Sequence, residues 1–107
     1  MIKTSGYRVS PTEIEEVVFA SGLVDETAAV GLPHPTLGQS ITLLVKPKDG
    51  TAADKEALLA ICRQQLPAFM VPHEIEERRE LYRNPNGKID RKRHAQELIA
   101  KQQDKSA

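Results

Sequence analysis

A lysine stands directly after a strong turn signal in the last third of the chain. The four residues before it are Asn84, Pro85, Asn86 and Gly87. Asparagine and glycine tolerate positive φ and proline restricts its own φ, so these residues predict a tight surface turn. The ammonium group of Lys88 could reach a phosphate or a carboxylate from there, because lysine is a point charge on a flexible stem. The alternative is a solvated surface lysine, since Asn-Gly turns are common in hairpins.

A glycine near the N-terminus is the second candidate. Gly6 follows Ser5 and lies between Lys3 and Arg8. Glycine has no side chain, so another chain or a narrow ligand can pass close to its backbone N–H and C=O groups. The alternative is a glycine that is needed only for the turn in which it lies.

Basic residues are concentrated in one segment. From Arg78 to Arg93 there are seven Lys or Arg residues against only Glu80 and Asp90. Such a segment could meet phosphate groups, although charge runs also form solvated faces. The whole chain balances 15 basic against 15 acidic residues. This balance argues against binding a nucleic acid backbone, which requires an excess of positive charge.

The histidines and the single cysteine show no spacing typical of a metal site. His34 and His73 lie beside prolines in predicted loops, and His94 lies on a predicted helix. Without a His-x-x-x-His pattern we expect no metal site. Cys62 lies among apolar residues at helical spacing, which predicts a buried structural thiol. The sequence also contains no Ser-His-Asp arrangement and no Walker-type phosphate loop.

The N-terminal segment predicts a hairpin followed by a helix. Extended stretches at residues 2–3 and 7–9 flank the turn at Gly6. The helix begins at Ser10, and Pro11 and Glu13 complete the pattern of a capping box. Its buried face consists of apolar residues at helical spacing, namely Ile14, Val17 and Val18. Ser21-Gly22 marks its end.

The remaining elements alternate between strands and helices. Residues 23–32 and 41–45 predict an antiparallel strand pair. A rigid loop around Pro33-His34-Pro35 joins them. A helix capped by Asp54 follows and ends at Pro67, and a short strand lies at residues 73–78. The last helix spans residues 91–101, and residues 102–107 are expected to be a fraying tail.

This order predicts an α+β fold. We expect a small three-stranded, mainly antiparallel sheet packed with about three helices, plus an N-terminal two-stranded hairpin. The length of 107 residues suits one domain, and 39% hydrophobic with 28% charged residues is ordinary for a globular protein. No apolar run approaches the roughly 20 residues that span a bilayer. Because no signal peptide is recognisable either, we expect a cytoplasmic protein without membrane insertion.

Two segments resemble core motifs of a known superfamily. MIKTSGYRVSPTEIEE is similar to the latter part of its eighth motif, and NPNGKIDRK is similar to its tenth. AVGLPHPTLGQSI and LPAFMVP match the connecting pattern between them. The chain thus resembles, over nearly its whole length, the C-terminal domain of AMP-forming acyl-CoA synthetases, peptide synthetase adenylation domains and firefly luciferase. TSGYRVSPTEIEE resembles the acyl-CoA synthetase branch most.

The resemblance implies roles for the candidate residues. Lys88 would bridge the substrate carboxylate and the α-phosphate of ATP while pyrophosphate leaves. The domain would then turn on a hinge and bring the face with Lys3, Ser5, Gly6 and Arg8 to the acyl-adenylate. Gly6 would line the tunnel for the pantetheine arm, and Arg8 would approach the phosphates of coenzyme A (CoA).

The resemblance also implies partners. Residues 1–107 would be a single C-terminal lid domain that begins just beyond the hinge. The large N-terminal adenylation domain, with the adenine and acid pockets, would be absent. ATP, CoA and a carboxylic acid would be substrates of the full-length enzyme, together with Mg²⁺. The isolated domain would be inactive and bind none of them. Where relatives often have proline before the Gly-Lys pair, this chain has Tyr82.

Two alternatives stay open at this point. The lid could belong to an adenylation domain that loads a carrier protein instead of free CoA. The chain could also be a non-catalytic binding module that shares the fold, because fold alone does not specify function.

Overall fold

The computed structural model describes residues 2–48, 50 and 52–106, with side chains as far as Lys101. The elements are β1 (Ile2–Thr4), β2 (Tyr7–Val9), α1 (Pro11–Ala20), β3 (Val24–His34), β4 (Gly38–Pro47), α2 (Lys55–Gln65), the 3-10 turn η1 (Ala68–Met70), β5 (Glu74–Glu77) and α3 (Arg91–Ser106). The predicted α+β fold is confirmed.

The strands form one mostly antiparallel sheet of five strands. Its order is β2-β1-β4-β3, and β5 pairs with β4 in the parallel direction. The long strands β3 and β4 pair over almost their whole lengths. The predicted N-terminal hairpin is present and joins this sheet where Thr4 pairs with Gly38.

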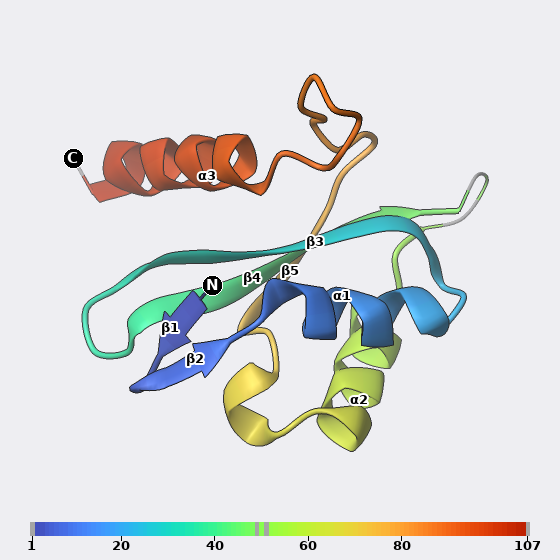
Figure 1. Cartoon of the computed structure of the whole chain (residues 1–107), viewed down its shortest axis with the longest axis horizontal. Helices are drawn as coiled ribbons and strands as arrows, with labels where there is room; N and C mark the ends of the chain where they lie inside the picture. Colours follow the sequence, from blue (N-terminus) through green and yellow to red (C-terminus); the bar gives the residue numbers. More distant parts are fainter. Residues whose placement is uncertain (1, 49, 51, 107) are drawn as a thin grey trace.

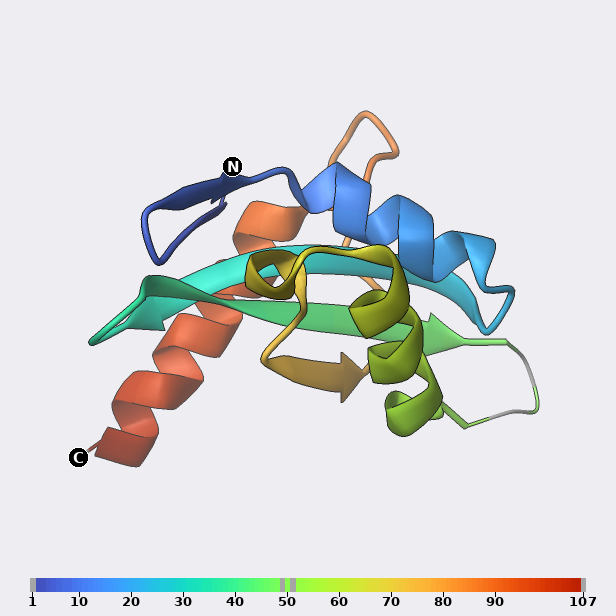
Figure 2. The same cartoon turned by 90° about the horizontal axis from the view of Figure 1, so that it is seen from below.

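Helices cover both faces of the sheet. Figure 1 shows α3 on one face and α1 with α2 on the other. Figure 2 shows the N-terminal hairpin projecting beside the start of α1, at one end of the sheet. A sheet covered on both faces explains why residues 41–45 of β4 are all buried and do not alternate between buried and exposed.

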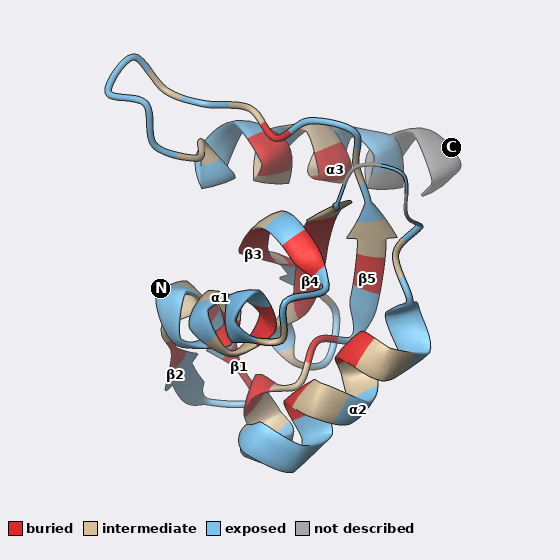
Figure 3. Ribbon diagram, turned by 90° about the vertical axis from the view of Figure 1, so that its right-hand side faces the viewer, coloured by how far each residue is buried: buried red, intermediate tan, exposed pale blue. Residues whose placement is uncertain are grey.

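Each face of the sheet has its own hydrophobic core. Alternate residues of β4 divide between them: Leu43 belongs to the cluster under α1 and α2, and Leu44 to the cluster under α3. Figure 3 shows the buried residues of the helices facing the sheet. Cys62 of α2 is fully buried in the first cluster, as predicted, and burial raises the pKa of its thiol. Burying one valine, leucine or isoleucine side chain contributes about 1.5–3 kcal/mol, so these clusters hold the helices in place.

Most predicted helix ends are confirmed, with one correction. Ser10 occupies the N-cap of α1, but its side chain makes no capping hydrogen bond, so the predicted capping box is wrong. The backbone provides the contact instead, because the Glu13 N–H donates to the Ser10 carbonyl oxygen at 3.2 Å. Asp54 caps α2 as predicted, with its carboxylate accepting the Ala57 N–H at 3.0 Å.

Two boundary predictions are wrong. The strand β3 continues through Pro33 and His34, which were predicted as loop. A proline is tolerated there because β3 is an edge strand. His34 ends the strand, since its Nδ1 accepts the N–H groups of Thr36 and Leu37 at 3.2 and 3.0 Å. The predicted fraying tail is helical as far as Ser106, in keeping with the good helix propensity of glutamine and lysine. Ala107 lies outside the described residues.

Candidate functional site

Lys88 lies on a short hairpin between β5 and α3, which we call the Lys88 hairpin (residues 82–90). At its base the Asp90 N–H donates to the Tyr82 carbonyl oxygen at 2.7 Å. Nearer the tip the Asn84 N–H donates to the Lys88 carbonyl oxygen at 2.8 Å. Gly87 closes the turn with a φ of 81°. The predicted turn is therefore confirmed, and it is the tip of a hydrogen-bonded hairpin.

Asn84 holds the backbone of Lys88. Its side-chain Oδ1 accepts the Lys88 N–H at 3.1 Å and the Asn86 N–H at 2.9 Å. Both backbone polar groups of Lys88 are thus bound to Asn84. The side chain of Lys88 is exposed and has no ion-pair partner in the described part of the chain. The hairpin therefore fixes the backbone position of Lys88, while its ammonium group extends outward without an ion-pair partner among the described residues.

Three of the seven basic residues between Arg78 and Arg93 form ion pairs with glutamates from other elements. Arg78 pairs with Glu97 of α3 at 2.8 Å. Arg83 pairs with Glu26 of β3, and Arg91 pairs with Glu15 of α1 at 2.5 Å. The predicted basic patch is therefore neutralised in part, because the fold brings to it glutamates that are distant in the sequence.

A side-chain cluster joins the base of the Lys88 hairpin to α3. The Tyr82 N–H donates to His94 Nε2 at 2.8 Å, and the two rings stack with centroids 4.5 Å apart. The Tyr82 hydroxyl donates to the Glu97 carboxylate, and the Arg93 guanidinium lies 4.0 Å from the centre of the Tyr82 ring. This cluster was not predicted from the sequence. The signal was present in the spacing of His94 and Glu97, which lie on one side of a helix.

The electrostatics of the cluster favour a charged Glu97 and a neutral His94. The hydrogen bonds from Tyr82 and Arg78 lower the pKa of Glu97 to about 2. The same bond to Glu97 raises the pKa of Tyr82, so its hydroxyl stays protonated. Burial, followed by the positive charge of Arg78, lowers the pKa of His94 below its ordinary value of 6.5.

Replacing Glu97 with glutamine is expected to flatten the acid dependence of folding stability. A carboxylate with a lowered pKa stabilises the folded state above its ordinary pKa of 4.5, and this contribution is lost as the pH falls toward about 2. The variant should be less stable than the wild type at neutral pH, and the difference should shrink in acid. Urea unfolding of the chain at several pH values measures this, with Glu80→Gln as the exposed control. Parallel pH profiles for Glu97→Gln and the wild type would contradict the assigned interaction.

The second candidate group lies on the N-terminal hairpin (residues 2–9). Its two-residue turn, Ser5 and Gly6, has φ values of 52° and 83°, as a tight hairpin turn requires. Lys3 pairs directly across from Arg8. Like charges opposite each other destabilise a strand pair. Neither cation has an ion-pair partner among the described residues, so the hairpin presents two uncompensated positive charges.

The turn of the N-terminal hairpin is anchored but open around Gly6. The Ser5 N–H donates to the Leu37 carbonyl oxygen at 2.9 Å, and the Lys3 N–H donates to Gln39 Oε1 at 2.8 Å. A Cβ atom on Gly6 would have no described atom within 4 Å. The glycine therefore serves the turn by its positive φ, and the space beside it is open to a molecule from outside.

The two candidate sites lie in different parts of the molecule. In Figure 1 the tip of the Lys88 hairpin (orange) stands on the α3 side of the sheet, and the N-terminal hairpin (blue) lies at the opposite side. The structure therefore does not bring Lys88 together with Lys3, Ser5, Gly6 and Arg8.

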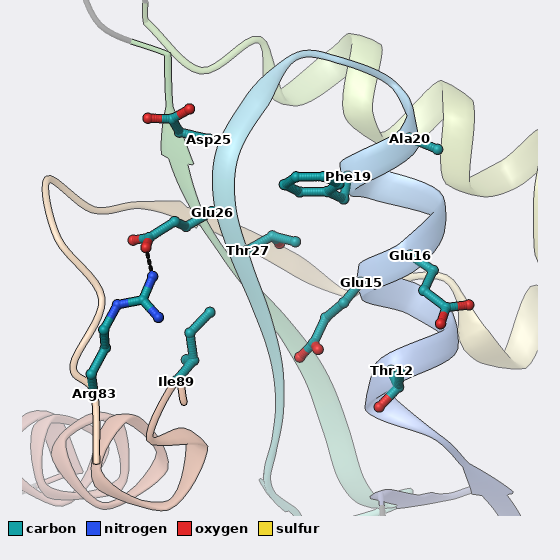
Figure 4. Close-up of a pocket in the computed structure, with 10 residues that line it drawn as sticks. All are labelled: Thr12, Glu15, Glu16, Phe19, Ala20, Asp25, Glu26, Thr27, Arg83 and Ile89. Carbon is teal, nitrogen blue, oxygen red and sulfur yellow. Dashed lines mark ion pairs between the residues drawn. The ribbon is translucent and has the colours of Figure 1, made fainter. Parts of the chain in front are cut away.

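A groove of about 470 Å³ borders the Lys88 hairpin. Figure 4 shows Phe19 from α1 on one side and Ile89 from the Lys88 hairpin on the other, with the Arg83–Glu26 ion pair at its margin. Phe19 is 60% exposed, which is unusual for a large apolar side chain. The hairpin that carries Lys88 thus lies next to an apolar surface.

No group of three or more His, Cys, Asp or Glu residues in the described ranges could hold a metal ion. In the same ranges no helix is long and apolar enough to cross a membrane.

Comparison with known proteins gives the family. The family model described as "AMP-binding enzyme C-terminal domain" matches residues 13–88. The chain is 40% identical over 106 residues to a long-chain-fatty-acid–CoA ligase of Salmonella typhimurium, covering 99% of this chain and 19% of that protein. It is 32% identical over 101 residues to an oxalate–CoA ligase of Arabidopsis thaliana, covering 94% of this chain and 20% of that protein.

A solved structure gives the same result. The Brucella canis acyl-CoA synthetase superposes with a TM-score of 0.87 at 31% identity, covering 94% of this chain and 19% of that one. The chain therefore spans about a fifth of the length of these relatives. The resemblance noted in the sequence is confirmed, and the chain belongs to the AMP-binding enzyme C-terminal domain family.

Proposed function

We propose that this chain is the C-terminal lid domain of an AMP-forming acyl-CoA ligase. Such an enzyme converts a carboxylic acid, ATP and CoA into acyl-CoA, AMP and diphosphate. The relatives support this assignment because their names are those of CoA ligases and synthetases. The chain aligns with only 19% of the Salmonella ligase, which supports a larger N-terminal domain as its partner.

Lys88 acts in the first half-reaction of this proposal. Attack of the carboxylate oxygen on the α-phosphorus forms the acyl-adenylate and breaks the bond to diphosphate. Negative charge develops on the phosphate oxygens during this step, and a preorganised cation lowers its barrier. The observation that carries the proposal is that Lys88 is exposed and lacks an ion-pair partner in the described part of the chain, while Asn84 binds both of its backbone polar groups.

The N-terminal hairpin acts in the second half-reaction. The CoA thiol attacks the acyl carbonyl carbon, AMP leaves, and the thiol proton is released. Arg8 and Lys3 lie opposite each other without a described counter-ion, and the phosphates of CoA would provide that counter-charge. Ser5 and Gly6 form the turn between these cations, and the open space beside Gly6 admits a narrow pantetheine arm.

One domain can serve both steps by rotating as a rigid body. The two hairpins lie on different parts of the surface, so each can complete the active site of the large domain only in a different orientation. Mg²⁺ would accompany ATP in the intact enzyme. Among the described residues no group of three or more His, Cys, Asp or Glu could hold that ion.

A comparison of acceptors tests the proposed function. We expect the intact ligase to form acyl-CoA and AMP when supplied with an acid, ATP and free CoA, and to leave a carrier protein unmodified. The isolated chain should give no heat when titrated with ATP in a calorimeter, because the adenine and acid pockets would lie in the large domain. Transfer to a carrier protein in place of CoA would instead assign the lid to an adenylation domain. ATP binding by the isolated chain would contradict the division of the active site.

A further inference from the structure

Several contacts attach the base of the Lys88 hairpin to α3, and in one of them a side chain of the helix accepts a backbone N–H of the hairpin. The Tyr82 carbonyl oxygen bonds within the hairpin, to the Asp90 N–H at 2.7 Å. The Tyr82 N–H instead points to α3 and donates to His94 Nε2 at 2.8 Å. A buried N–H without an acceptor costs about 1–3 kcal/mol, so this contact helps to decide where the hairpin lies relative to the helix.

The geometry specifies the protonation state of His94. A backbone N–H can only donate, so Nε2 must be the unprotonated nitrogen and the proton lies on Nδ1. His94 is only 1% exposed, and its Nδ1 has no hydrogen-bond partner among the described residues. A second proton would place an N–H on Nε2, facing the N–H of Tyr82. Protonation therefore replaces an attractive contact with a repulsive one at the base of the hairpin.

We propose that His94 is a positioning residue for Lys88, acting through its neutral imidazole on the Tyr82 N–H. The part of this proposal that concerns the role of Lys88 rests on the proposed function. The attachment of the hairpin to His94 does not depend on that function. The path is short and continuous. His94 holds Tyr82, Tyr82 bonds across the hairpin to Asp90, and Asn84 bonds to both backbone groups of Lys88. A shift of the base is therefore transmitted to the point from which the lysine side chain starts.

Some of the groups around His94 favour its protonation and others disfavour it. Arg78, from the segment after β5, and Arg93, from α3, disfavour its protonation. Glu97 of α3 and Asp90 of the Lys88 hairpin favour protonation, and the Tyr82 ring packs against the imidazole. Burial and Arg78 are the strongest influences, so the pKa of His94 is lowered and the attachment stays intact at neutral pH. It is lost only in acid.

The attachment can be tested on the chain itself by nuclear magnetic resonance. We expect the nitrogen-15 shifts to show an unprotonated Nε2 in His94. His94→Leu removes the acceptor, so hydrogen exchange at the Tyr82 and Lys88 amides should accelerate by about tenfold, the equivalent of one lost hydrogen bond. Exchange in β4 should not change. His94→Gln, whose side-chain oxygen can replace Nε2, should restore protection, and Gln96→Ala on exposed α3 surface is the control. Unchanged exchange in His94→Leu overturns the proposal.

The consequence for catalysis can be tested in the intact ligase. His94→Leu should lower the kcat of adenylation by up to about a hundredfold through misplacement of Lys88, while thioester formation from supplied acyl-adenylate continues. His94→Gln should retain most of the activity. The adenylation kcat of His94→Gln should also fall less in acid than that of the wild type, because glutamine has no imidazole to protonate. Equal losses in both half-reactions, or wild-type adenylation in a His94→Leu variant with accelerated exchange, overturn the positioning role.

The two proposals fail in distinguishable ways. If Lys88→Ala adenylates normally, the proposed role of Lys88 is wrong, whatever His94 does. The exchange measurement still decides whether His94 holds the hairpin, because it does not depend on catalysis. If His94→Leu leaves exchange unchanged while Lys88→Ala abolishes adenylation, only the positioning proposal is wrong.

Discussion

Replacing Lys88 with alanine in the intact ligase is expected to slow acyl-adenylate formation by about 10²–10³-fold, the usual cost of removing one preorganised group that stabilises developing charge. Thioester formation from supplied acyl-adenylate should be nearly unaffected, because we propose that the N-terminal hairpin, and not Lys88, serves that step. Diphosphate release measures the first half-reaction, and acyl-CoA formation from synthetic acyl-adenylate measures the second. The role of Lys88 is tested by the ratio of the fold losses in the rates of the two half-reactions.

The control for this variant is another exposed lysine. Lys92 lies on the surface of α3 and has no ion-pair partner within the described ranges. Lys92→Ala removes the same charge from the domain, so it should leave both half-reactions close to the wild-type rates. The role assigned to Lys88 is wrong if its alanine variant slows both half-reactions equally, or if Lys92→Ala has the same effect.

Replacing Gly6 with leucine is expected to give the opposite pattern, with thioester formation slowed by about a hundredfold and adenylation largely retained. Nothing within the described chain lies within 4 Å of a Cβ atom at this position. A leucine there would therefore obstruct a molecule that enters from outside rather than disturb the core. Thioester formation with CoA and acyl-adenylate measures the loss.

The strain of this substitution needs a matched control. Gly6 has a φ of 83°, so any other residue there costs about 1–2 kcal/mol in backbone conformation. Gly22, at the end of α1, has a φ of 75° and an equally empty surrounding. Gly22→Leu should therefore lower stability by a similar amount without slowing thioester formation. If the two variants slow this step equally, the effect comes from strain and the tunnel role of Gly6 is refuted.

Local chemistry explains which parts of the fold were predictable. The turn before Lys88, the end of α1 and the Asp54 cap depend on residues close together in the chain, and all three are confirmed. Predictions failed where distant contacts replaced local preferences. The Pro33-His34 segment was predicted as loop, but pairing with β4 keeps it extended. The Ser10 capping box failed because the backbone of the first turn already made the contact.

The candidate residues could be recognised from the sequence because their signals are local. The residues that contact them in the fold could not be recognised in this way. Lys88 and Gly6 stand in turns with local signals. The partners of the basic segment could not be found in this way, because Glu15 and Glu26 precede it by more than fifty residues. The departure at Tyr82 was visible in the sequence, but its consequence was not. Tyrosine has an N–H that proline lacks, and only the packed structure shows that His94 accepts it.

The sequence by itself determined the elements, the family and the two turns that carry the candidate groups, because each depends on residues that are neighbours in the chain. The tertiary structure alone decided which charges remain free and what holds the Lys88 hairpin. Ion pairs and buried hydrogen bonds form between segments that are distant in sequence, and folding must bring those segments together before the charges can compensate one another. Arg83 and Arg91 are neutralised by that folding, whereas Lys88 has no ion-pair partner among the described residues.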